Sequence, residues 1–462
     1  MGGRARRAYA GGIESSRFQA MPHVDARGVE VSGATPGALG AYELSLARLV
    51  GGERDALLPI EAALVGAPAF AMGHALRAAA SVIDDDRTDT IAVVRAVAAI
   101  GHSNTATERE RRHAAAAQAW IDGDAARALV LYGALVDDYP RDLLALRAAL
   151  ALDFRIGSRN MLRDRVARAL PHWSAEVPGY GHVVALHAFG LEENGDYDAA
   201  QAAAHRALDH EPECASAIHT LAHVCEMRGR AADGIALLQR TRGVWATHPG
   251  FASHILWHLA VFHVDQGETD RALAIYDDAL APRDGLSPAT LVDASALLWR
   301  LELRGVAAHG RWRVLARSWA WQRLRGARAF NVVHAVMAQA GARRIIRARR
   351  AAALLFDDVA TLRANRGEDL DFASAFSSAL IAFARGRYSE AVDRIDEVRA
   401  RADRCGGSVA QCDLIHLTLI EAALRAQRDR LARALVAERA LRRPMSRLGR
   451  WLFARASAPV AA

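Results

Sequence analysis

The stretch HTLAHVCEM places two histidines four residues apart, and a glutamate three residues after the second histidine. These residues are His219, His223 and Glu226, and on an α-helix their side chains share one face. Imidazole nitrogens and a carboxylate in this arrangement can bind zinc or iron, transfer protons, or hold an anionic ligand. Which chemistry applies depends on where the helices that carry these residues place them.

Glycines recur along the chain at a nearly constant interval. Steps of 34, 38, 34 and 38 residues separate Gly123, Gly157, Gly195, Gly229 and Gly267. After Gly51, Gly123 and Gly195, an alanine follows five residues later and a proline seventeen residues later. A period near 34 with these residues is typical of tetratricopeptide repeats, in which each unit is a pair of antiparallel helices. Such units stack into a superhelix with a concave inner surface.

The pattern fades after Pro282, but later segments stay amphipathic with a helical period, and no segment alternates as a strand would. We therefore expect a single all-α solenoid. Residues 30–282 are predicted to form tetratricopeptide-type repeats, and residues 283–448 divergent helical hairpins that continue the same solenoid. A disordered tail over residues 1–29 and a C-terminal tail over residues 449–462 are expected to flank it.

The repeat also gives the polar side chains a direction. In each unit, the alanine seven residues before the turn glycine lies where the two helices touch, and the first helix lines the groove. At 100° per residue, one set of side chains falls between about 40° and about 160° from that alanine. This set comprises His182, Glu192, His219, His223, Glu226, His254, Trp257 and His258. His187 falls on the opposite side, and we expect it to pack away from the groove.

Three functions stay open for this histidine-rich groove. We favour recognition of a small molecule or peptide with an anionic or metal-binding group, which imidazoles suit near neutral pH. The alternative is an enzyme that uses the groove histidines and Glu226 as metal ligands or as general acids and bases, with His219, His223 and Glu226 as catalytic candidates. If a metal binds, zinc or iron is the candidate cofactor, and its candidate ligands are His219, His223, Glu226, His254 and His258. A pure protein-interaction scaffold is the third hypothesis, and it predicts a broad, open groove.

The composition and missing motifs exclude several classes of protein. The chain contains no lysine, which excludes a Schiff base with pyridoxal phosphate and a lysine-dependent phosphate loop. HExxH, GxSxG and a glycine-rich nucleotide loop are absent too. The net charge is +7, but basic residues are scattered among acids, so we expect no nucleic-acid partner. Four cysteines without a CxxC pair, and no long apolar run, favour a reduced, cytoplasmic protein without membrane contact.

Several motifs occur together in the order of one known family. They are HTLAHVCEM at 219–227, HILWH at 254–258, FNVVH at 330–334 and GGSVAQCD at 406–413. With the segments between them, they make the chain similar to the tetratricopeptide repeat protein 38 family from about Glu30 to about Leu448. The resemblance implies an α-helical repeat fold and no particular activity. It adds His334 to the candidate ligand-binding residues, although Val332 stands where the family has aspartate.

Overall fold

A computed structural model describes residues 23–458 apart from 54, 84–88, 284–286, 323, 325–326 and 357–368. Helices make up most of this part of the chain. The strands within it are the two-residue segments β1 (His23–Val24) and β2 (Glu30–Val31), which pair antiparallel. The all-α helical repeat solenoid predicted from the sequence is therefore confirmed.

The N-terminal half contains α1 (Pro36–Gly51), α2 (Leu58–Gly66), α3 (Ala71–Ile83), α4 (Thr90–His102), α5 (Glu108–Ile121), α6 (Ala125–Asp138), α7 (Leu143–Arg155), α8 (Arg159–Ala169), η2 (Leu170–His172), α9 (Tyr180–Glu193), α10 (Tyr197–His210), α11 (Ala215–Arg228), α12 (Ala231–Arg240) and α13 (Arg242–Trp245). The C-terminal half contains α14 (Pro249–Gln266), α15 (Thr269–Ile275), η3 (Tyr276–Leu280), α16 (Pro288–Leu303), α17 (His309–Trp321), α18 (Ala329–Gly341), α19 (Ile345–Ala353), η4 (Leu354–Phe356), α21 (Leu370–Ala384), α22 (Tyr388–Val398), η5 (Arg399–Cys405), α23 (Val409–Arg425), α24 (Asp429–Arg442) and α25 (Arg447–Ser457). Within the described ranges, no helix has both the length and the apolar character needed to cross a bilayer.

The periodic glycines end the first helix of successive hairpins. All five have φ between 71° and 83°, the left-handed region in which glycine carries no Cβ penalty. Gly229 has a second reason to be glycine, because a Cβ there would lie 2.3 Å from the backbone nitrogen of Ser446. The turn after α11 is therefore also a contact point for the C-terminal segment.

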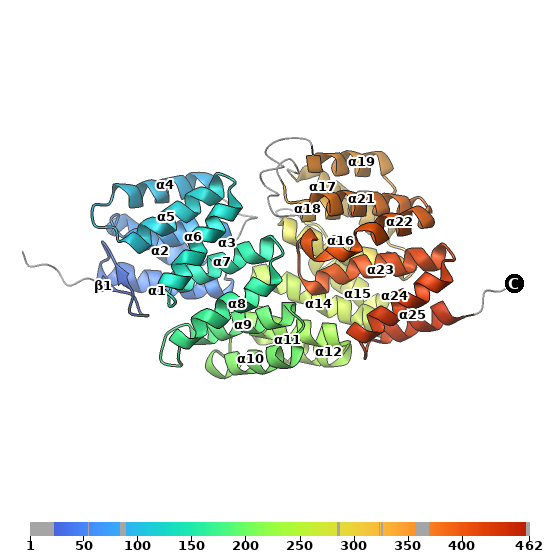
Figure 1. Cartoon of the computed structure of the whole chain (residues 1–462), viewed down its shortest axis with the longest axis horizontal. Coiled ribbons are helices and arrows are strands. Elements are labelled where there is room, and N and C mark those ends of the chain that lie inside the picture. The colour runs from blue at the N-terminus through green and yellow to red at the C-terminus, as the bar shows by residue number, and fades with distance from the viewer. Residues whose placement is uncertain are drawn as a thin grey trace, which may run out of the picture.

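The chain folds back on itself (Figure 1). After the stack of α16, α18 and α21, the last helices return to the middle of the array. There α23 contacts α11 and α16, and α25 contacts α14. The largest apolar cluster accordingly runs from Trp257 in α14 to Ala456 in α25, so residue 282 does not separate two cores.

Both ends of the described chain are more ordered than the sequence predicted. Residues 23–31 form the β1–β2 hairpin, in which Asp25 and Arg27 are buried, so the predicted tail over residues 1–29 is wrong for this part. Residues 1–22 lie outside the described residues. The tail predicted for residues 449–462 is wrong up to Ser457, because α25 buries Leu448, Leu452 and Ala456 at four-residue spacing.

A buried network of charges anchors the N-terminal hairpin. Arg109 donates from Nε to Oδ2 of Asp142 at 2.6 Å and from Nη1 to the carbonyl oxygen of Glu30 at 3.1 Å. Its Nη2 lies 3.4 Å from the carboxylate of Asp25, and Nε2 of His113 lies 2.8 Å from Asp142. Burial alone would raise the pKa of Asp142, but Arg109 and His113 outweigh burial and hold that pKa below its ordinary range.

Replacing Arg109 with methionine should lower the free energy of unfolding by roughly 3 kcal/mol at neutral pH, because Asp142 and Asp25 then stay buried without their cation. The depressed pKa of Asp142 means that its ion pair stabilises the fold above about pH 4 and loses that contribution as the pH falls further. The difference between wild type and Arg109→Met should therefore narrow below about pH 4. Urea unfolding followed by circular dichroism at several pH values measures this difference.

Arg112→Met is the matched control on the same helix. Arg112 pairs with Glu108 and Asp138 at the surface, where ion pairs add little to stability, so this variant should unfold almost as the wild type does. Equal losses in the two variants would contradict the assignment of the stability to the buried network.

Candidate functional site

The two histidine pairs predicted from the sequence meet in one cluster. α11 carries His219 and His223, and the adjacent α14 carries His254 and His258. One ring nitrogen from each of the four lies within 4.8 Å of the others, and the Nε2 atoms of His219 and His258 are 3.1 Å apart. α11 and α14 open consecutive repeat units, so the spacing within each helix and the stacking of the units together bring the rings to one point.

Three of the four imidazoles contact a carboxylate through Nδ1. These contacts join His223 to Glu192 at 3.0 Å, His254 to Asp293 at 2.8 Å, and His258 to Glu226 at 2.9 Å. Where the carboxylate is ionised, it only accepts hydrogen bonds, so Nδ1 of the imidazole donates and Nε2 carries the lone pair. The Nε2 of His223 is buried and has no hydrogen-bond partner among the described residues. With ionised carboxylates, the arrangement gives the tautomer that metal-binding histidines use.

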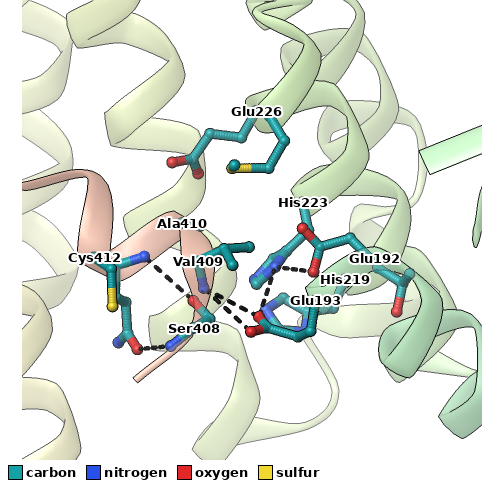
Figure 2. Close-up of polar contacts among 12 residues, drawn as sticks. Glu192, Glu193, His219, His223, Glu226, Ser408, Val409, Ala410 and Cys412 are labelled. Carbon is teal, nitrogen blue, oxygen red and sulfur yellow. Dashed lines mark hydrogen bonds and ion pairs between the residues drawn. The ribbon is translucent and has the colours of Figure 1, made fainter. Parts of the chain in front are cut away.

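The C-terminal helices contact two of these carboxylates, Glu226 and Asp293, and also Glu193, which lies beside His223. The backbone nitrogen of Val409, the first residue of α23, donates to the Glu193 carboxylate at 3.2 Å and 3.3 Å, beside His223 (Figure 2). Arg443 donates from Nη1 to the carbonyl oxygen of Glu226 at 3.2 Å and to its carboxylate at 3.4 Å. Nε2 of Gln411 donates to Asp293 at 3.4 Å. The site is therefore completed by residues distant in the sequence.

Burial keeps most of the imidazoles neutral. Burial and the neighbouring imidazoles lower the pKa values of His219 and His258 well below the ordinary value, and burial lowers the pKa of His223 to about 4. Burial alone would lower the pKa of His254, but the nearby Asp293 outweighs burial and raises that pKa. The rings of His219, His223 and His258 are thus uncharged near neutral pH, which is the form that binds a metal ion.

The carboxylates beside the cluster show the opposite shift. Burial, followed by the charge of Glu226, raises the pKa of Glu192 well above its ordinary value. Burial, followed by Glu192, raises the pKa of Glu193 to about 8. Arg159 and Arg443 oppose the shift at Glu192 without cancelling it. A cation held by the four imidazoles would favour the ionised carboxylates, so the donor set fits a metal ion.

A cavity of about 480 Å³ lies beside the cluster, within the range of small-molecule sites. Three cluster residues line it, together with four phenylalanines: His219, His223, His254, Phe154, Phe189, Phe251 and Phe330. Ser408 and Gln411, at the start of α23, also belong to its wall. The lining extends from α1 to α23, so the cavity exists because the array folds back.

Several predicted groove residues are placed differently from the prediction. Five are at most 5% exposed and do not line the cavity: Glu192, Glu226, Trp257, His258 and His334. Glu192, Glu226 and His258 belong to the hydrogen-bond network behind the histidines that line the cavity. Trp257 stacks on His254 with ring centroids 5.4 Å apart, and Nδ1 of His334 contacts the carbonyl oxygen of Phe330 at 2.8 Å. The angles around the helices predicted which side of α11 and α14 faces the cavity. They could not predict which residues on that side are buried by other parts of the chain.

His182 is outside the cluster, contrary to the prediction of one shared surface. Its Nδ1 lies 3.7 Å from Sγ of Cys214. Ten residues, or about 15 Å along the helix axis, separate it from Glu192, so a common angle does not bring the two together. His187 also lies outside the cluster, as predicted, and burial followed by Arg206 and Arg163 lowers its pKa.

Sequence reasoning missed three residues of the site: Glu193, Asp293 and Arg443. Glu193 directly follows a predicted residue, but its role depends on a backbone nitrogen of α23. Asp293 lies in the fading part of the repeat, and the carboxyl group in an otherwise apolar helical stretch was the signal available. Arg443 is one of many arginines, and nothing local to it indicates a contact with Glu226.

A family model for the tetratricopeptide repeat matches residues 191–243, which span the end of α9, α10, α11 and α12. The match includes His219, His223 and Glu226, and ends before α14. Together with the stacked hairpins, it defines the chain as a tetratricopeptide-type helical repeat protein. Repeats of this type commonly mediate binding to partners.

Arg443→Met should lower the free energy of unfolding by roughly 3 kcal/mol, because Glu226 and Asp413 lose a buried cation. Glu226→Gln should lower the free energy of unfolding by less in the Arg443→Met variant than in the wild type, because the two side chains interact. Urea unfolding of the single and double variants measures this coupling. Arg447→Met removes an exposed arginine nearby and should leave stability almost unchanged. Additive effects of the Arg443 and Glu226 changes would contradict the assigned contact.

Proposed function

We propose that this tetratricopeptide-type protein is a metalloprotein that binds a small molecule. In this proposal His219, His223, His254 and His258 hold one divalent transition-metal ion, zinc or iron. The ligand enters the adjacent cavity and presents a metal-binding group, such as a carboxylate, to the ion. Neither the metal nor the ligand follows from the repeat fold alone, so the support comes from the histidine cluster and its surroundings.

The observation that carries the proposal is the set of three imidazole–carboxylate pairs around one point, of which two are buried and the pair of His254 and Asp293 is partly buried. Histidines that serve only packing normally have both ring nitrogens satisfied. Here Nε2 of His223 is buried without a partner among the described residues, while Nε2 of His219 and Nε2 of His258 hydrogen-bond to each other at 3.1 Å. A metal ion would replace that hydrogen bond and bind all three nitrogens at once. The carboxylates would act as its outer ligands by orienting the rings.

The distances suit a single ion. Zinc–nitrogen bonds of about 2.0–2.1 Å in a tetrahedron place the nitrogens roughly 3.3 Å apart. The 3.1 Å separation of His219 and His258 is close to this value, and small ring rotations within the 4.8 Å limit bring in the others. Four imidazoles would close the tetrahedral shell of zinc, whereas iron prefers six ligands and would keep positions open for a ligand. The identity of the metal therefore bears directly on the role of the cavity.

The lining of the cavity supports an amphipathic small molecule as the ligand. Aromatic and aliphatic side chains make up most of its wall, and Arg147, Arg155 and Arg328 belong to the lining as well. A ligand with an apolar body and one or two acidic groups would match both features. A cavity of this size is less suited to a long peptide than the broad groove of a scaffold would be.

An enzyme remains the second candidate, and one observation favours it. His219, His223 and His254 line the cavity while His258 lies behind them, so a bound substrate would meet the ion from one side. A divalent ion there would act as a Lewis acid on a coordinated oxygen. The chain would contribute the orienting carboxylates and the surrounding apolar wall. An enzyme would convert a ligand of the cavity into a product, whereas a binding protein would release it unchanged.

We further propose membership of the tetratricopeptide repeat protein 38 family and a cytoplasmic setting. The motifs that carry the resemblance are HTLAHVCEM, HILWH, FNVVH and GGSVAQCD, and residues of all four lie in or beside the site. Cys214, Cys225 and Cys412 are buried and form no disulfide, which agrees with a reducing environment.

The first test is elemental analysis of protein purified without an affinity tag, from cells supplied with zinc and iron. The wild type should contain about one ion per chain, and a His223→Ala, His258→Ala double variant should lose it, because two of the four ligands are gone. A His182→Ala, His187→Ala double variant is the matched control and should keep the ion. A wild type without metal, or equal retention in the two double variants, would refute the metal site.

A second test concerns the outer carboxylates. Asp293→Asn should weaken metal affinity about 10- to 100-fold, because the amide holds the His254 ring less firmly and no longer raises its basicity. Competition with a chromophoric chelator measures this affinity. Asp277→Asn, which changes an exposed carboxylate paired with Arg311, should leave the affinity unchanged. Unchanged affinity in Asp293→Asn would contradict the assigned role of this carboxylate.

A further inference from the structure

A second cavity, of about 360 Å³, lies on another face of α23. Ser408 and Gln411 belong to the wall of the first cavity, whereas Val409, Cys412 and Asp413 belong to the wall of this one. Its other walls come from the starts of α8 and α10, from η5 and from α24. Segments from both halves of the sequence therefore enclose it.

Arginine dominates the polar lining of this cavity. Five guanidinium groups belong to it, those of Arg159, Arg399, Arg439, Arg442 and Arg443, against the carboxylates of Asp413 and Glu438. Asp413 forms ion pairs with two of these five arginines, at 3.1 Å from Arg439 and 3.5 Å from Arg443. Carboxylates next to the cavity pair with three of the arginines: Glu193 with Arg159 at 3.3 Å, Asp396 with Arg399 at 2.9 Å, and Glu226 with Arg443 at 3.4 Å. The positive charge available to an anion therefore comes mainly from Arg439 and Arg442.

Two of these arginines have hydrogen-bonding capacity left over. Arg439 is 5% exposed, and its Nε is buried without a partner among the described residues, although its Nη atoms donate to Ser446 and Asp413. Arg442 lies at the mouth of the cavity, and its Nη1 contacts Nε2 of His416 at 3.0 Å. Within the described part of the chain, Arg442 forms no ion pair with a carboxylate. A ligand with several anionic oxygens would use both groups.

We propose that this arginine-lined cavity binds a phosphate or pyrophosphate group, either free or as an ester. Guanidinium groups match the oxygens of phosphate in paired hydrogen bonds, and several of them can share one polyvalent anion. The apolar side chains of Leu435 and Ile420 on the same wall leave room for an organic part of an ester. The volume admits one small molecule, so a nucleic acid strand does not fit. This inference does not depend on the metal site.

The test is isothermal titration of the full chain with inorganic phosphate, pyrophosphate and glycerol phosphate. Arg442→Gln removes a charge at the mouth of the cavity and should weaken binding about tenfold, the usual effect of losing one charge-assisted hydrogen bond. Ala400→Trp replaces an exposed residue of the lining and should block entry without changing any charge. Arg433→Gln, which removes an exposed arginine of the same helix outside the cavity, should bind as the wild type does.

Each outcome decides for or against the site. Binding that falls in Arg442→Gln and Ala400→Trp but not in Arg433→Gln supports it, and tighter binding of the ester than of phosphate identifies an organic ligand. Equal weakening in the two arginine variants would mean general charge attraction, and full binding by Ala400→Trp would place the anion elsewhere. Absence of binding by all three probes would also overturn the proposal. His223→Ala should keep full affinity, and loss there would assign the anion to the histidine cluster instead.

Discussion

A carboxylate buried beside an imidazole is stable only where its charge and its lone pairs are both satisfied, and this constraint organises the middle of the molecule. Glu192, Glu226 and Asp293 all lie against histidines of α11 and α14. The return of the C-terminal helices adds a partner for two of them, because the amide side chain of Gln411 donates to Asp293 and the guanidinium group of Arg443 donates to Glu226. The backbone amide of Val409 donates to Glu193, the neighbour of Glu192. The pKa of Glu192, which gains no such partner within the described residues, is raised well above its ordinary value.

This requirement explains why the repeat array is not an open superhelix. An open tetratricopeptide stack offers a concave surface to solvent. Here α23 covers that surface, and its first turn faces two cavities with different chemistry. One has aromatic walls and imidazoles, and the other has arginines. The helix that separates them is anchored to Glu193 by the backbone nitrogen of Val409 and to α16 by Arg300 and Trp299, so both cavities depend on the docking of this helix.

The sequence predicted the features that depend on local spacing. The turn glycines, the hairpins and the convergence of His219, His223, His254 and His258 all follow from helical geometry and the repeat period. The sequence could not predict which residues at distant positions complete the site. Arg443 and Glu226 are 217 residues apart, and no periodicity relates them. The error at His182 has the same origin, because an angle around a helix contains no information about height along it.

The long separation between Glu226 and Arg443 also has a consequence for the order in which the protein is made. At roughly 5–20 residues per second, a ribosome adds Arg443 about 10 to 40 s after Glu226. The repeat units that carry the imidazoles are therefore exposed to the cell before the helices that enclose them exist. In a nascent chain, both cavities therefore lack the walls that α23 and α24 provide until those helices have been made.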